Sequence, residues 1–176
     1  MTPTSPPVLR VQRATFDDVP DVARIHVRSW QSGYRGQIPD SVLDALDIEQ
    51  RAGVWKKNIA EPGRVLLLAQ LDTRTIGFCS LSPSRDAGAA PDTAEVTAMY
   101  VDPDHYRSGA GTALMAAACA EARGRGDRLL TLWVIDTNQR GRRFYESCGL
   151  RWDGATQEVK RPEYTLHELR YRVDLV

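Results

Sequence analysis

The sequence predicts an α/β fold of the α+β kind, in which helices cover a single mixed sheet. Short apolar or alternating segments, typical of strands, interchange with segments whose apolar residues recur at the helical period. Helix-start signals and glycine or proline stops separate these segments. The chain has 176 residues and a formal net charge of zero, and this length is enough to bury the core of one domain. We therefore expect one domain over residues 8–176, preceded by a disordered tail over residues 1–7.

Local capping signals place the helices in the first half of the chain. Thr15 is followed by Asp18 at the spacing of a capping box, with aspartate in place of the usual glutamate. Asp47 and Gln50 can cap a later helix, which a Pro-Gly pair then ends. The expected helices of this half span residues 19–30, 40–46 and 47–59.

Strands are expected where apolar or β-branched residues cluster between turn residues. The run over residues 128–135 is apolar throughout, so helices or other elements should cover both of its faces. Residues 82–92 and 153–163 are interpreted as loops, since they are small, polar or interrupted by turn formers. The expected strands span residues 8–13, 64–71, 75–81, 93–101, 128–135, 150–153 and 165–175, and two further helices run from the glycine loop to residue 123 and over residues 138–147.

The stretch from Glu95 to Leu114 carries the most functional information. It reads as a strand, a turn marked by proline, a loop containing Gly109 and Gly111, and a helix start. The first N–H groups of a helix lack partners, and the helix dipole adds positive potential there, so such an end binds phosphate. The two glycines let the backbone approach a ligand without a Cβ between them. The stretch therefore predicts a site for a phosphorylated cofactor. A dinucleotide fingerprint is not met, because Leu114 stands at its third glycine.

Two blocks resemble motifs of the GNAT superfamily of acyl-CoA-dependent N-acetyltransferases. Residues 99–103, Met-Tyr-Val-Asp-Pro, with Gly109-Ala-Gly111 are similar to motif A, although Tyr106 stands where the family has arginine or glutamine. Residues 138–150, which begin at Asn138 and contain Phe-Tyr-Glu, resemble motif B. The resemblance implies the family's fold, a mostly antiparallel mixed sheet whose central strands splay to admit the cofactor.

The resemblance also implies how acetyl-CoA is held as a co-substrate. The strand edge of motif A would pair through its backbone with the pantetheine arm, and the glycine loop would hold the diphosphate. The asparagine of motif B would bond the pantetheine arm, although helix capping is an alternative role for it. The expected cofactor-binding residues are Met99, Tyr100, Val101, Arg107, Ser108, Gly109, Ala110, Gly111, Thr112, Asn138 and Tyr145. Some of Arg107, Arg140, Arg142 and Arg143 could meet the 3′-phosphate.

Two residues are candidates for proton transfer on the basis of the same resemblance. Tyr145 matches the family's tyrosine that protonates the departing thiolate, and the alternative is an aromatic side chain packed beside Phe144. Glu95 matches the base glutamate of the histone-modifying branch, and the alternative is a surface or ion-paired carboxylate. An alkyl ammonium has a pKa near 10.4, so some base must remove its proton before attack.

The acceptor stays open at this point. Trp30 and Tyr34, with Tyr164 and residues 153–163, fall where the family builds its acceptor pocket, but they could equally be core. Trp133 stands where the branch that acetylates ribosomal protein N-termini carries an acid, which argues against that substrate. The acceptor could be a small molecule or a peptide or protein amine.

Composition limits the other classes of function. The neutral chain does not favour nucleic acid, and no apolar run reaches ~18 residues, so a membrane span is not expected. The three cysteines lack metal-binding spacing and are read as reduced thiols of a cytoplasmic protein, with no metal site. The resemblance allows a homodimer. The leading hypothesis is an N-acetyltransferase acting by direct attack, and the alternative is a non-catalytic acyl-CoA-binding sensor or regulatory domain.

Overall fold

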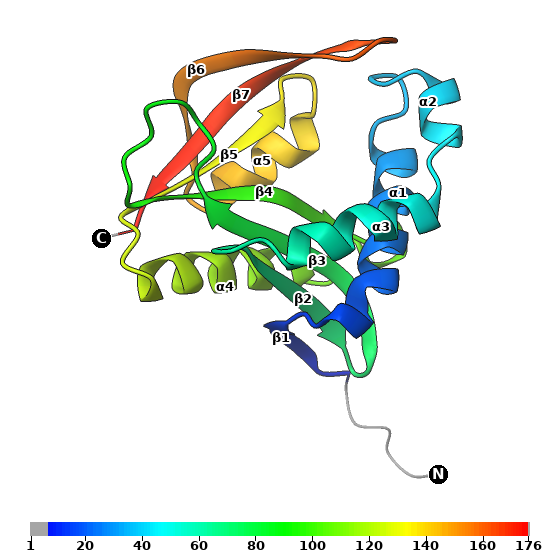
Figure 1. The fold of residues 1–176 in the computed structure, drawn as a ribbon, viewed down its shortest axis with the longest axis horizontal. Coiled ribbons are helices and arrows are strands. Elements are labelled where there is room, and N and C mark those ends of the chain that lie inside the picture. The colour runs from blue at the N-terminus through cyan, green and yellow to red at the C-terminus, as the bar shows by residue number, and fades with distance from the viewer. Residues whose placement is uncertain (1–6, 176) are drawn as a thin grey trace.

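A seven-stranded sheet forms the centre of the computed structural model, which describes residues 7–175 (Figure 1). The strand order is β1-β2-β3-β4-β5-β7-β6, and every neighbouring pair is antiparallel except β4 and β5. The strands are β1 (Leu9–Arg13), β2 (Val65–Leu71), β3 (Arg74–Pro83), β4 (Thr93–Val101), β5 (Leu129–Ile135), β6 (Arg151–Lys160) and β7 (Thr165–Asp174). The helices are α1 (Val19–Gly33), α2 (Asp40–Asp44), α3 (Ile48–Ile59), α4 (Ala110–Gly124) and α5 (Gln139–Ser147), with 3₁₀ turns at Phe16–Asp18 and Pro103–His105. Apart from Pro7, the predicted tail lies outside the described residues.

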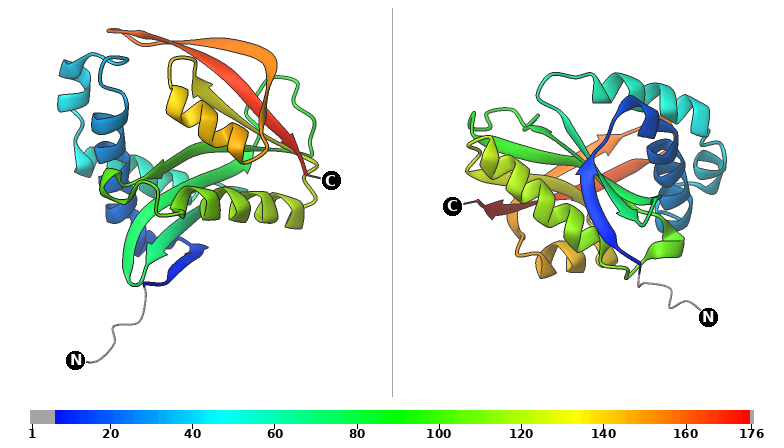
Figure 2. Two further views of the ribbon diagram at one scale, coloured as in Figure 1. Left: turned by 180° about the vertical axis from the view of Figure 1, so that it is seen from behind. Right: turned by 90° about the horizontal axis from the view of Figure 1, so that it is seen from below.

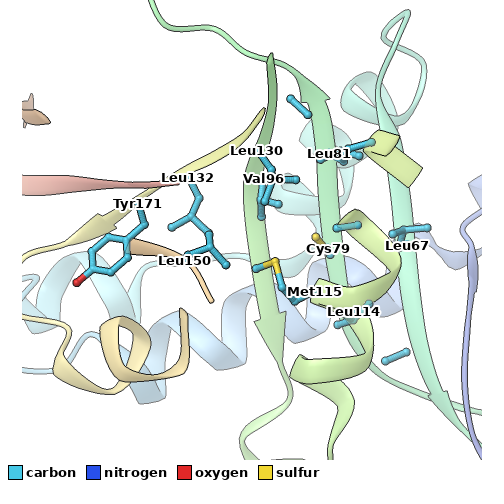
Figure 3. Close-up of a cluster of buried hydrophobic side chains, with 14 of the residues drawn as sticks. Leu67, Cys79, Leu81, Val96, Leu114, Met115, Leu130, Leu132, Leu150 and Tyr171 are labelled. Atoms are coloured by element: carbon cyan, nitrogen blue, oxygen red, sulfur yellow. The ribbon is translucent and has the colours of Figure 1, made fainter. Parts of the chain in front are cut away.

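Helices cover both faces of the sheet. On one face α1 and α3 pack against β2 and β3, and on the other α4 packs against β1 to β4 (Figure 2). Neighbouring residues of β2 therefore enter different cores, since Leu66 and Leu68 face α1 and α3 while Leu67 faces α4. Figure 3 shows the larger core, in which Leu114 and Met115 of α4 lie beside the sheet. Burial on both faces explains why these strands are apolar at successive positions rather than alternating.

The predicted splay of the central strands is confirmed. β4 and β5 pair only from Thr93 opposite Leu129 to Val96 opposite Leu132, and beyond that point the two strands separate. The pairing of β3 with β4 shifts register between Ser80 and Leu81, which leaves Thr97 as the extra residue of a bulge in β4. A bulge bends its strand and increases its twist. The second half of β4 therefore stays with β3 and leaves β5, which opens the sheet at its centre.

The expectation of a loop over residues 153–163 is wrong, because β6 continues to Lys160 and forms a long hairpin with β7. From Asp153 onward its residues alternate between half-buried and exposed, but only two of the half-buried ones, Ala155 and Val159, are apolar, so the hydrophobic alternation that marks the strand is weak. Pairing with β7 supplies what the sequence pattern lacks. The tip of this hairpin packs against the end of α1 and α2 through Leu166, Val159 and Tyr164 (Figure 1). Within residues 7–175, no helix is long and apolar enough to cross a membrane.

Candidate active site

The splay between β4 and β5 opens onto two adjoining cavities. The first has a volume of about 640 Å³ and lies between β4, the start of α4 and α5. The second has a volume of about 460 Å³ and lies between β4, β5, the end of α1 and the β6–β7 hairpin. The residues that line both cavities are Tyr34, Met99, Tyr100, Asn138 and Tyr145. Two compartments that share one wall suit a reaction between two bound molecules.

The loop before α4 presents unpaired backbone donors to the first cavity. Gly109 has φ of 85° and Arg107 has φ of 64°, so the chain turns through the left-handed region twice before the helix begins. Among the described residues, no protein acceptor is found for the N–H groups of Arg107, Gly109, Gly111 and Thr112. All six residues from 107 to 112 line this cavity. Free amides at a helix start form an anion site.

Glycine is required at Gly109 and at Gly111 for different structural reasons. A Cβ at Gly109 would meet nothing closer than 3.8 Å, so the positive φ is what requires glycine there. A Cβ at Gly111 would lie 3.2 Å from two ring atoms of Phe144. Gly111 is therefore required by the close packing of α4 on α5, and not only by access for a ligand as its position in the motif suggests.

One edge of β4 has no strand beside it over Met99 to Val101. β3 pairs with the other edge, and β5 has already diverged. All three residues line the first cavity. The Val101 carbonyl accepts a hydrogen bond from Ser29 Oγ at 3.0 Å, which ties α1 to this edge. An open strand edge can pair with an extended amide-bearing ligand.

Tyr145 lies where the two cavities meet. Its ring packs against Phe144 and the larger core, with ring centroids 5.3 Å apart. Burial raises the pKa of Tyr145 above that of an ordinary phenol. The residue is thus a packed aromatic side chain that also lines both cavities, so the two roles weighed for it are compatible.

Glu95 is buried on β4, lines the second cavity and is ion-paired. Its Oε2 accepts from the backbone N–H of Arg85 at 2.9 Å and from Arg85 Nε at 3.2 Å, and its Oε1 accepts from Arg85 Nη2. The ion-paired alternative therefore describes the side chain as it stands. A role as base would require Arg85, whose side chain is 62% exposed, to move aside.

Asn138 caps α5 and lines both cavities. Its Oδ1 accepts from the backbone N–H of Gly141 at 3.0 Å. A Cβ at Gly141 would fall 2.7 Å from Asn138 Nδ2, so glycine at this position is what lets the side chain fold back onto the helix. The capping role is thus observed, and it leaves Asn138 at the boundary between the cavities.

Arg140 and Arg142 of α5 lie in different environments. Arg142 donates to the Tyr171 hydroxyl at 3.2 Å and to the Asp136 carbonyl at 3.0 Å, which is a structural role. Arg140 places its guanidinium 4.2 Å from the ring centroid of Tyr106 and donates to its hydroxyl at 3.1 Å. Both members of that stack line the first cavity. The cation that motif A lacks at Tyr106 is therefore brought beside it by a different helix.

A buried ion-pair network fixes α1 against the end of β4. Asp102 accepts from Arg24 at 2.8 Å and from Arg28 at 3.2 Å, and its side chain is 1% exposed. Burial opposes ionisation, but hydrogen bonds from the Asp104 backbone and from both arginines outweigh it and lower the pKa of Asp102. The network sets the position of Trp30 and Tyr34, which lie in edge contact at 5.3 Å and line the second cavity.

The sequence reasoning missed two polar residues of the second cavity, Gln157 and Glu168. They face each other across the β6–β7 hairpin, and Gln157 Nε2 donates to Glu168 Oε2 at 2.7 Å. The available signal was the spacing of Ala155 and Val159, which places Gln157 between them on the same face of a strand, and interpreting that segment as a loop concealed it.

Comparison with known proteins gives a consistent result. The model of the Acetyltransferase (GNAT) family matches residues 20–150. An uncharacterized N-acetyltransferase of Bacillus subtilis (strain 168) is 30% identical over 132 residues, which cover 74% of this chain and 74% of that protein.

Solved structures share the fold. The PaiA N-acetyltransferase of Thermoplasma acidophilum, solved in complex with coenzyme A, has a TM-score of 0.74 at 16% identity, covering 95% of this chain and 99% of that one. The ribosomal-protein-alanine N-acetyltransferase of Brucella melitensis has a TM-score of 0.75 at 23% identity, covering 94% and 99%. At these identities the likeness concerns the fold alone.

Proposed function

The chain belongs to the GNAT acetyltransferase family, and from this premise we propose that it moves an acetyl group from acetyl-CoA to a primary amine by direct attack in a ternary complex. The observation that carries the proposal is the pair of cavities that meet at Tyr145. The first cavity would hold acetyl-CoA and the second the amine. Both reactants would then reach the shared wall from opposite sides.

The residues around the first cavity fit coenzyme A. The free amides between Arg107 and Thr112 suit its diphosphate, and the open edge of β4 suits the amides of its pantetheine arm. The stacked guanidinium of Arg140 lies on the same cavity and suits a phosphate group. The structural relative from Thermoplasma acidophilum, solved with coenzyme A, supports the same assignment.

Acetyl-CoA supplies an activated acyl group as a thioester, and the chain must manage two protons. A phenol has a pKa near 10 and burial raises that of Tyr145 further, so its hydroxyl carries a proton at neutral pH. We assign it as the donor to the departing thiolate, a transfer that runs uphill in pKa and depends on the thiolate developing in the same dry site. Glu95 is the proposed acceptor of the amine's proton, directly or through water, once Arg85 releases it. The neutral amine then attacks the acyl carbon, the C–S bond breaks as the thiolate takes the Tyr145 proton, and the proton lost from the new amide nitrogen restores the Tyr145 hydroxyl.

The cysteines favour direct attack over an acyl-enzyme. A thiolate is the nucleophilic form of cysteine. Burial raises the pKa of Cys79 to about 12, and burial also raises the pKa of Cys119 and of Cys148. None of the three thiols is therefore activated to carry the acetyl group.

The test measures free-thiol release from acetyl-CoA with a panel of primary amines, beside thermal unfolding with and without acetyl-CoA. Thiol release that depends on one class of amine would support the transferase. Stabilisation by acetyl-CoA without release on any amine would instead favour a non-catalytic acyl-CoA sensor. The observation in favour of that second candidate is the occupation of both Glu95 oxygens by Arg85.

A further inference from the structure

We propose that Glu168 binds the ammonium group of the acceptor, and that the acceptor is a small primary monoamine with an aromatic or apolar body. The inference rests on the proposed acetyl transfer and adds to it a substrate class and the residue that selects it. The evidence for this inference lies in the second cavity, where one carboxylate forms no ion pair.

Glu168 lies in the middle of β7, opposite Ile135 of β5 and Gln157 of β6. Its Oε2 accepts from Gln157 Nε2 at 2.7 Å. Within residues 7–175, its Oε1 accepts no hydrogen bond and neither oxygen takes part in an ion pair. The side chain is half-buried and lines the cavity, so this oxygen is available to a ligand.

The arginines around Glu168 are already paired with other carboxylates. Arg85 is held by Glu95, and Arg170 lies between Asp86 at 3.0 Å and Asp153 at 2.8 Å. Glu168 forms no ion pair of its own, although the charge of Arg85 still acts on it. The group holds four carboxylates against two arginines, so this part of the cavity carries net negative charge.

Two further arginines lie at the margins of the cavity. Arg161 lies at the exposed tip of the hairpin, where it donates to the Lys160 carbonyl at 3.1 Å. Arg51 of α3 lies 6.0 Å from the ring centroid of Trp30 and does not line the cavity. Neither meets Glu168, so the charge that fits beside this carboxylate is a ligand cation.

The walls of the cavity suit a cation that carries an apolar body. Trp30, Tyr34, Tyr100, Trp133 and Tyr164 all line it, and aromatic faces attract ammonium groups. Burial raises the pKa of Tyr34 and of Tyr100, so their hydroxyls are neutral dipoles.

The size and charge of the site narrow the class of amine. A volume of about 460 Å³ falls within the range of small-molecule sites. Glu168 binds the ammonium group, and Glu95 serves the proton of the same nitrogen, so the two carboxylates favour a monoamine over a polyamine, whose second ammonium would have no partner. An α-amino acid is disfavoured, because its own carboxylate would lie next to Glu168 and be repelled.

Binding is tested by calorimetric titration of the whole protein, alone and with coenzyme A, with 2-phenylethylamine, its neutral analogue 2-phenylethanol, and phenylalanine. The amine should bind more tightly than either comparison ligand, by about 10-fold or more, since hydrogen bonds to charged groups are the stronger ones. Glu168→Gln keeps the size of the side chain and should remove this preference for the amine. The matched control is Glu158→Gln, which changes an exposed carboxylate of the same hairpin that does not line the cavity.

The outcomes separate this inference from the proposed function. Amine binding that depends on Glu168 would support the inference even if no thiol were released. Thiol release with an amine KM unchanged in Glu168→Gln would overturn it while leaving acetyl transfer intact. Equal binding of amine and alcohol, or no binding of the amine at millimolar concentration, would also overturn it. Thermal unfolding of Glu168→Gln checks that the variant folds.

Discussion

Replacing Gly111 by alanine is expected to destabilise the protein through a single contact. The new Cβ would lie 3.2 Å from two ring atoms of Phe144, so α4 and α5 must separate by a few tenths of an ångström. Overpacking of this kind costs about 1–3 kcal/mol. Alanine is favoured over glycine in a helix by up to about 1 kcal/mol, which offsets part of that cost. We expect a net loss of about 1 kcal/mol in the free energy of unfolding and a decrease in Tm of about 2–4 °C.

A double-mutant cycle with Phe144→Leu tests the cause. If the ring is the obstacle, Gly111→Ala should be neutral or stabilising once Phe144 is leucine. The coupling free energy should then be about 0.5–3 kcal/mol, measured by denaturant unfolding. An effect of Gly111→Ala that is the same in both backgrounds would refute the packing argument.

Gly109→Ala is the matched control two residues away. A Cβ there would have ordinary clearance, 3.8 Å from Leu9, so its cost comes from φ of 85° and should be about 1–2 kcal/mol. This cost should not depend on Phe144. Relaxation of the strained turn would redirect the free amides, so coenzyme A affinity, measured by calorimetry, should fall more in Gly109→Ala than in Gly111→Ala.

Three further predictions concern proton transfer and acid stability. Tyr145→Phe should lower kcat by about 100-fold or more with little change in cofactor affinity. Burial raises the pKa of Tyr145, so this loss should be constant up to about pH 10; full activity would remove Tyr145 from the mechanism. Glu95→Gln should alter the pH–rate profile of thiol release, and an unaltered profile in this variant would exclude the glutamate as base. The pKa of Asp102 is lowered on folding, so its ion pairs stabilise the fold above the unfolded value of about 3.9 and lose that effect as the pH falls further. Asp102→Asn should therefore be less stable than wild type at pH 7 in thermal unfolding, and a gap that persists in full at low pH would contradict this.

Much of the fold follows from signals that act over a few residues. The capping box of Thr15 and Asp18 forms as predicted, and Asp47 caps α3 by accepting from the Gln50 backbone at 2.7 Å. β4 spans Thr93–Val101, as the sequence predicts. In each case the partners are close in sequence or the strand is strongly apolar, so local chemistry is enough to define the element.

The sequence by itself also determined the family motifs and the glycine loop, because those residues act through a short continuous stretch of backbone. Only the tertiary structure decided what surrounds them. In the folded chain β6 pairs with β7, and the Arg140 guanidinium stacks on the ring of Tyr106. Glu95 forms an ion pair with Arg85, whereas Glu168 forms none. The side-chain contacts among these join residues 10 or more positions apart, and they depend on strand register and on where β4 leaves β5. No local pattern contains that information, so the two cavities and the charges within them emerge only when the sheet is assembled.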